Sequence, residues 1–133
     1  MLRFLLVLLV LASSALFGCS GPAPAETTVS LVSERGLLDA DISFGTPVAR
    51  GSNELFVQLR PHSHATDGRA RLLAVHATMA AHAHEAQAEA IDETDSGFYA
   101  KKLDLFMTGR WLVTLDLAFA SEPDSVSLPI DVP

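Results

Sequence analysis

Apolar and polar residues alternate along most of the chain after residue 28, and this period of two is the feature that most constrains the fold. The alternation is longest from Trp111 to Phe119 and from Val126 to Val132. Shorter strand-like stretches cover residues 28–32, 42–44, 55–59, 72–78 and 97–106. Successive side chains of a β-strand point to opposite faces, so each stretch indicates a strand with one buried face. With turn residues between the stretches, the pattern predicts an all-β antiparallel sandwich of about seven strands.

The alanine-rich segment 74–90 is the stretch in which a helix competes with a strand. Alanine is the best helix former, which favours a helix. Against this, Glu85, Gln87 and Glu89 alternate strictly with alanines, a pattern typical of a strand with one solvated face. We therefore expect strand structure here. The same interpretation applies from residue 72 onward, and it predicts one shared face for Leu73, Val75 and Ala77.

The first 19 residues resemble the signal of a bacterial lipoprotein. Arg3 supplies a positive charge, residues 4–11 form an unbroken apolar run, and Leu16-Phe17-Gly18-Cys19 is similar to a lipobox, with Phe17 as a departure from it. An uncleaved transmembrane anchor is the alternative. Its apolar stretch would be shorter than the roughly 20 residues that span a bilayer.

The lipobox resemblance implies three segments. Residues 1–18 would be the signal peptide, residues 19–27 a tether lipidated at Cys19, and residues 28–133 the folded domain. Two or more acyl chains are enough for stable membrane anchoring. We therefore expect a lipid-anchored, extracytoplasmic protein. In a cell with two membranes, Ser20 after the cysteine favours the outer membrane, facing the periplasm.

Composition excludes several classes of site. Cys19 is the single cysteine, so neither an internal disulfide nor a cysteine-based metal site is possible. The formal net charge of −7 disfavours nucleic acid as a partner, because nucleic acid binds clustered lysine and arginine. The sequence has no glycine-rich phosphate loop and no nucleophile elbow, so we expect no enzymatic activity.

Three segments together resemble the YtkA-like (FixH-related) domain family. They are a strand running into residues 79–84, the segment Ser96-Gly97-Phe98-Tyr99-Ala100, and the segment Met107-Thr108-Gly109-Arg110-Trp111. The resemblance covers about residues 50–119 and implies an immunoglobulin-like β-sandwich. It also implies an association with copper handling or with the assembly of a haem-copper oxidase.

All five histidines lie between residues 62 and 84, and four of them form two His-x-His pairs. Residues i and i+2 of an extended chain project to the same side, so two such imidazoles can converge on one ion. Met79 adds a thioether, a soft ligand that favours Cu(I). The sequence therefore predicts a metal site, with copper as the expected ion, formed by Met79, His82 and His84. The weaker candidates are His62, His64 and His76.

Other interpretations of these residues stay open. Met79 ends a predicted strand and is equally consistent with a plain core residue, and histidines in polar turns are often only solvated. Trp111 shares parity with the buried stripe, so we expect a core anchor there. Two functions follow: a metal-binding or metal-delivery accessory, or a non-catalytic interaction module that docks on a membrane complex.

Overall fold

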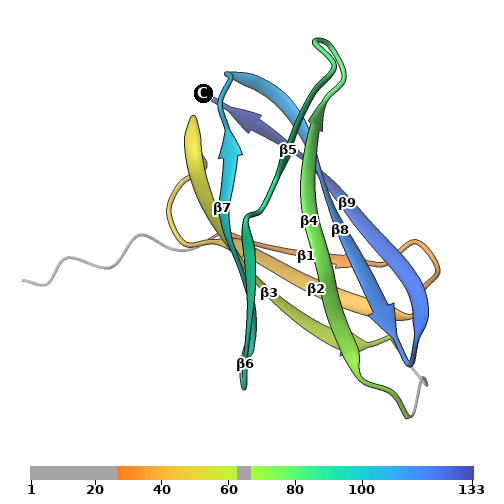
Figure 1. Cartoon of the computed structure of the whole chain (residues 1–133). Helices are drawn as coiled ribbons and strands as arrows, with labels where there is room; N and C mark the ends of the chain where they lie inside the picture. Colours follow the sequence, from red (N-terminus) through yellow and green to blue (C-terminus); the bar gives the residue numbers. More distant parts are fainter. Residues whose placement is uncertain (1–26, 63–66) are drawn as a thin grey trace, which may run out of the picture.

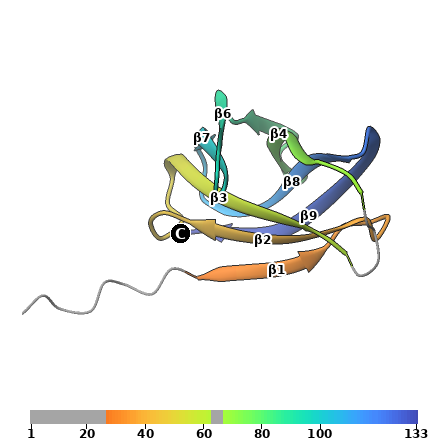
Figure 2. The same cartoon turned by 90° about the horizontal axis from the view of Figure 1, so that it is seen from below.

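The computed structural model describes residues 27–62 and 67–133, and these residues form two antiparallel sheets. The five-stranded sheet contains β1 (Thr28–Val32), β2 (Leu38–Phe44), β3 (Gly51–Pro61), β7 (Gly97–Leu105) and β6 (Ala90–Thr94), in that spatial order. The four-stranded sheet contains β5 (His84–Gln87), β4 (Ala70–Met79), β8 (Gly109–Phe119) and β9 (Glu122–Val132). The two sheets face one another across the core (Figures 1 and 2).

The connections follow the immunoglobulin-like pattern. The chain passes from one sheet to the other between β3 and β4, between β5 and β6, and between β7 and β8. The neighbours β2-β3-β7-β6 and β4-β8-β9 therefore match the two strand sets of an immunoglobulin constant-type domain. The predicted all-β sandwich is confirmed. The described residues form nine strands where about seven were expected, because residues 84–94 form two short strands, β5 and β6, that belong to different sheets.

The core consists of the inward residues of both sheets. The stripe from Trp111 to Phe119 is buried at every second residue, as the alternation predicts, and Val126 to Val132 follows the same pattern. The opposing sheet contributes buried residues from β2, β3 and β7: Leu38, Ala40, Ile42, Leu55, Val57, Phe98, Ala100, Leu103 and Leu105. Trp111 is completely buried, so its predicted role as a core anchor is confirmed.

The alanine-rich segment forms strands, as predicted, and no helix occurs in the described part of the chain. Long-range pairing decides this, because β4 pairs with β8 on one side and β5 on the other. The turn at residues 80–83 joins β4 to β5, with Ala83 in a left-handed conformation at a φ of 51°. Glu85, Gln87 and Glu89 are exposed, which agrees with the predicted solvated face.

The predicted shared face of Leu73, Val75 and Ala77 is wrong at Leu73. The register between β4 and β8 shifts between Leu72 and Ala74, which marks a β-bulge. Such a bulge adds one residue and reverses the direction of the side chains that precede it. Leu72 is therefore buried together with Val75, while the side chain of Leu73 is 51% exposed.

The sandwich has two ends, which we name by their loops. The histidine end is formed by the loop 45–50, the turn 80–83 and the bend 106–108. The opposite end is formed by the turns 33–37, 95–96 and 120–121. In the described ranges, no helix is long and apolar enough to cross a membrane. The predicted signal peptide and Cys19 lie outside the described residues.

Candidate metal centre

The three predicted ligands Met79, His82 and His84 belong to a single hairpin at the histidine end. Met79 is the last residue of β4 and pairs directly with His84, the first residue of β5. Directly opposite residues of an antiparallel pair project from the same face, so both side chains lie on the inner face of their sheet. The N–H of His82 donates to the carbonyl of Met79 at 3.2 Å and closes the turn between them.

The two imidazole rings lie close enough to share one ion. The ring centroids of His82 and His84 are 6.0 Å apart, and the ring planes are inclined by 29°. With metal–nitrogen distances of 2.0–2.1 Å, each bound ring has its centroid roughly 3.2 Å from the ion, so two centroids stand at most about 6.4 Å apart. His82 is exposed and His84 is half-buried, which leaves the pair accessible from solvent.

Met79 is part of the hydrophobic core, with only 2% of its surface exposed. Its terminal methyl carbon Cε lies 3.3 Å from the position that a Cβ on Gly109 would occupy. The thioether is thus near the first residue of β8, and the glycine leaves space beside it. The structure places Met79 opposite His84, but it keeps the sulfur behind other side chains.

An aromatic side chain that the sequence analysis did not select contacts this hairpin. Phe106 packs edge-to-face on His84, with centroids 5.2 Å apart, and edge-to-face on Trp111, with centroids 5.4 Å apart. The indole N–H of Trp111 donates to the carbonyl of Met107 at 3.0 Å. No sequence signal indicated this contact, because Phe106 follows the buried Leu105 and so falls on the outward parity of β7.

The weaker histidine candidates lie elsewhere. His62 is at the opposite end, where its Nδ1 lies 2.7 Å from Oδ1 of Asp39. His76 is on the outer face of β4, with its Nδ1 3.6 Å from Oδ2 of Asp116. His64 lies outside the described residues. The structure therefore brings His82 and His84 together, and neither His62 nor His76 joins them.

The candidate centre differs from a cluster of three or more His, Cys, Asp or Glu ligands. Among residues 27–62 and 67–133, no three His, Cys, Asp or Glu side chains are grouped so that they could hold a metal ion. The candidate centre offers two imidazoles and one thioether, a donor set that suits copper better than hard cations.

An exposed ion pair lies on the strands beside the candidate centre. Arg110 of β8 donates two 2.9 Å hydrogen bonds to Asp131 of β9, and these bonds lower the pKa of the Asp131 carboxyl.

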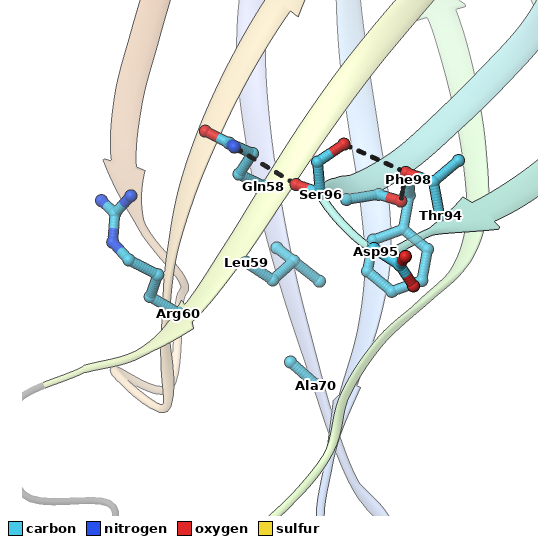
Figure 3. Close-up of a pocket in the computed structure, with 9 residues that line it drawn as sticks. Gln58, Leu59, Arg60, Ala70, Thr94, Asp95, Ser96 and Phe98 are labelled. Atoms are coloured by element: carbon cyan, nitrogen blue, oxygen red, sulfur yellow. Dashed lines mark hydrogen bonds between the residues drawn. The ribbon is translucent and has the colours of Figure 1, made fainter.

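The surface of the described residues has hollows at both ends of the sandwich. A polar depression of about 280 Å³ lies at the opposite end, where the amide of Gln58 donates to the carbonyl of Ser96 (Figure 3). Arg60 lines it but is bound to Asp41. A larger apolar groove of about 540 Å³ lies between the start of β1, the loop 45–50 and the end of β9.

Comparison with known proteins gives no relative: no protein-family model, curated protein or solved structure matches this chain. The resemblance to the YtkA-like family, drawn from three short segments, stays a prediction.

Proposed function

We propose that this protein is an exported, lipid-anchored β-sandwich that binds or delivers a metal ion, with copper as the ion. The observation that carries the proposal is the 6.0 Å separation of the His82 and His84 rings on one hairpin. The position of Met79 directly opposite His84 supports a sulfur contribution. The resemblance to YtkA-like domains adds the expectation that the recipient is a metal-handling or oxidase-assembly complex in the membrane.

Copper titration of the full chain in detergent tests this proposal. We expect one Cu(II) ion per chain near neutral pH, and weaker binding in acid because protons compete with the ion for imidazole. His82→Ala and His84→Ala should each lower the affinity by about tenfold or more, since losing one ligand bond of 1.4 kcal/mol already costs that factor. Isothermal titration calorimetry measures the affinity of each variant.

His62→Ala is the matched control, because it removes an imidazole at the other end of the sandwich, where the ring is bound to Asp39. This variant should bind copper as the parent does. Equal and weak affinity in the parent and in all three histidine variants would mean that the histidines bind metal only adventitiously. The copper proposal would then be wrong.

A second candidate function is a non-catalytic interaction module. One observation favours it: the three loops of the histidine end contain one charged residue, Arg50, and the neighbouring charges of Arg110 and Asp131 are paired with each other. Phe106 and Leu112 also expose 41% and 44% of their surfaces near this end. If copper binding fails, crosslinking from position 81 to a membrane complex, compared with crosslinking from position 121, tests this alternative.

The membrane anchor is part of the proposal and is tested separately. Cys19→Ser should abolish incorporation of labelled fatty acid and release the protein from membranes, because Cys19 is the only cysteine available for acylation. A Ser variant that stays membrane-bound and uncleaved would show that residues 1–19 are a transmembrane anchor instead.

A further inference from the structure

A row of three side chains crosses the inner face of the four-stranded sheet at the histidine end. Thr78 pairs with Leu112, so the next position brings Met79 of β4 beside Trp111 of β8. Met79 also pairs with His84 of β5. The thioether side chain therefore lies between an indole on one side and an imidazole on the other.

Phe106 lies over this row. Its ring contacts both flanking rings edge-to-face, at 5.2 Å from His84 and 5.4 Å from Trp111. Phe106 thus bridges the two rings that flank Met79. Met79 is only 2% exposed although it ends its strand, while Phe106 is 41% exposed.

The position of Phe106 in the chain is the next relevant feature. It begins the three-residue bend between β7 and β8, outside both strands. Its partner Trp111 is fixed, because it is completely buried and its indole N–H is bonded to the Met107 carbonyl. A rotation of the Phe106 side chain therefore requires no movement of Trp111.

We propose that Phe106 covers the thioether of Met79 and thereby determines which copper ion the hairpin binds. With Phe106 in place, the accessible donors are the imidazoles of His82 and His84, which suit Cu(II). With Phe106 displaced, the thioether joins them, and the soft sulfur favours Cu(I). This inference rests on the proposed function of His82 and His84 as copper ligands, and it makes Phe106 a positioning residue.

A double-mutant cycle on the full chain in detergent tests the proposal. Affinities for Cu(I), under reducing anaerobic conditions, and for Cu(II) are measured for the parent, Phe106→Ala, Met79→Leu and the double variant. Phe106→Ala should raise the Cu(I) affinity by about tenfold, whereas its Cu(II) affinity should stay equal or fall. In the Met79→Leu background, Phe106→Ala should give no gain for Cu(I), because no sulfur is left to expose.

Leu112→Ala is the matched control, since Leu112 is similarly exposed on the outer face of β8. It should change neither affinity. Phe106→Leu keeps an apolar cover and should bind both ions as the parent does, and the far-UV circular dichroism of every variant should match the parent.

The outcomes separate this inference from the proposed function. Suppose that Phe106→Ala raises the Cu(I) affinity even without Met79, or has no effect at all. Phe106 then does not control access to the thioether, and the assignment of His82 and His84 as ligands still stands. Unchanged copper affinity in the His82→Ala and His84→Ala variants overturns both proposals together.

Discussion

The two ends of the sandwich are closed by different chemistry. At the opposite end, the buried carboxylate of Asp124 links the β1–β2 turn to the β8–β9 hairpin: it accepts hydrogen bonds from Ser33 Oγ at 2.5 Å and from the N–H of Arg35 at 3.0 Å. At the histidine end, the buried amide of Asn53 bonds the backbone of Ala49 and Gly51 and closes the loop 45–50. The other two loops of that end are linked by ring contacts that run from His82 through His84 and Phe106 to Trp111. The polar group at the opposite end is fully bonded, whereas the hairpin at residues 79–84 presents two imidazoles at the other end.

This difference assigns stability to the opposite end and the proposed metal binding to the histidine hairpin. The oxygens of Asp124 also accept from the N–H groups of Leu37 and Ser125, and the described residues contain no buried side-chain N or O atom without a partner. Polar groups that are fully bonded inside the protein have no capacity left for a ligand. Among the described residues, the imidazoles of His82 and His84 make ring contacts and no side-chain hydrogen bond. We therefore expect mutations at the opposite end to change the free energy of unfolding, and mutations of His82 and His84 to change the affinity for copper.

The largest expected effect is that of Trp111→Ala. Truncating this completely buried ring should lower the free energy of unfolding by about 3–5 kcal/mol, because it leaves a cavity between the two sheets. Chemical denaturation followed by circular dichroism measures the change. Leu112→Ala, at the adjacent outward position, should have a much smaller effect, and a near-neutral Trp111 variant would contradict the core assignment.

Asp124→Ala should be the next most damaging change, at about 2–3 kcal/mol, because it leaves bonded donors at the opposite end without an acceptor. The same variant should bind copper as the parent does. Loss of copper binding in a folded Asp124→Ala protein would break the separation between the two ends.

The contribution of Asp124 should also depend on pH. Burial opposes its ionisation, but hydrogen bonds from Ser33 and from the N–H groups of Arg35, Ser125 and Leu37 outweigh this and lower its pKa. A carboxyl with a lowered pKa stabilises the fold above its ordinary pKa of about 3.9, and this stabilisation is lost as the pH falls through the lowered value. The stability difference between the parent and Asp124→Asn should therefore shrink below about pH 3.9. A constant difference would rule out this linkage.

Two glycines provide a matched comparison between the ends. Both have left-handed φ angles, 152° for Gly97 and 119° for Gly109. A Cβ on Gly97 would lie 2.6 Å from the carbonyl oxygen of Val57, whereas one on Gly109 would lie 3.3 Å from the flexible end of Met79. Gly97→Ala should cost about 1–3 kcal/mol, and Gly109→Ala less. Thermal unfolding of the two variants compares them, and the reverse order would contradict this local geometry.

The smallest effect is expected at the exposed ion pair of Arg110 and Asp131. Arg110→Ala should leave the denaturation midpoint unchanged within error, because water and salt screen such pairs. A clear loss of stability that disappears at high salt would show that this pair contributes to holding β8 and β9 together.

The alternation of side chains made most of the fold predictable. The stripe from Trp111 to Phe119 identified a strand with one buried face, and polar residues between alanines identified strands in the segment 74–90. The alternation failed at Leu73, because a bulge depends on how β4 meets β8 and leaves no mark on the period of β4 itself. The strand count exceeded the prediction because residues 84–94 divide into β5 and β6, and pairing with different sheets decides this division.

The candidate site was predictable only in part. His82 and His84 could be predicted as a pair, because residues two apart in a hairpin lie close together whatever the rest of the fold does. Nothing in the sequence connected Phe106 or Asp124 to their partners. Phe106 lies more than 20 residues beyond His84, and Asp124 lies 91 residues beyond Ser33. Lipidation of Cys19, copper and the membrane partner stay predictions.

The sequence by itself determined the strands and the inner face of most of them, since side-chain direction in a strand follows from local backbone geometry. It also determined that the hairpin at residues 79–84 presents two imidazoles. Only the tertiary structure decided what covers Met79 and what satisfies Asp124, because those contacts join segments that are distant along the chain. Local geometry fixes how a side chain points, and the packing of the two sheets fixes what it meets.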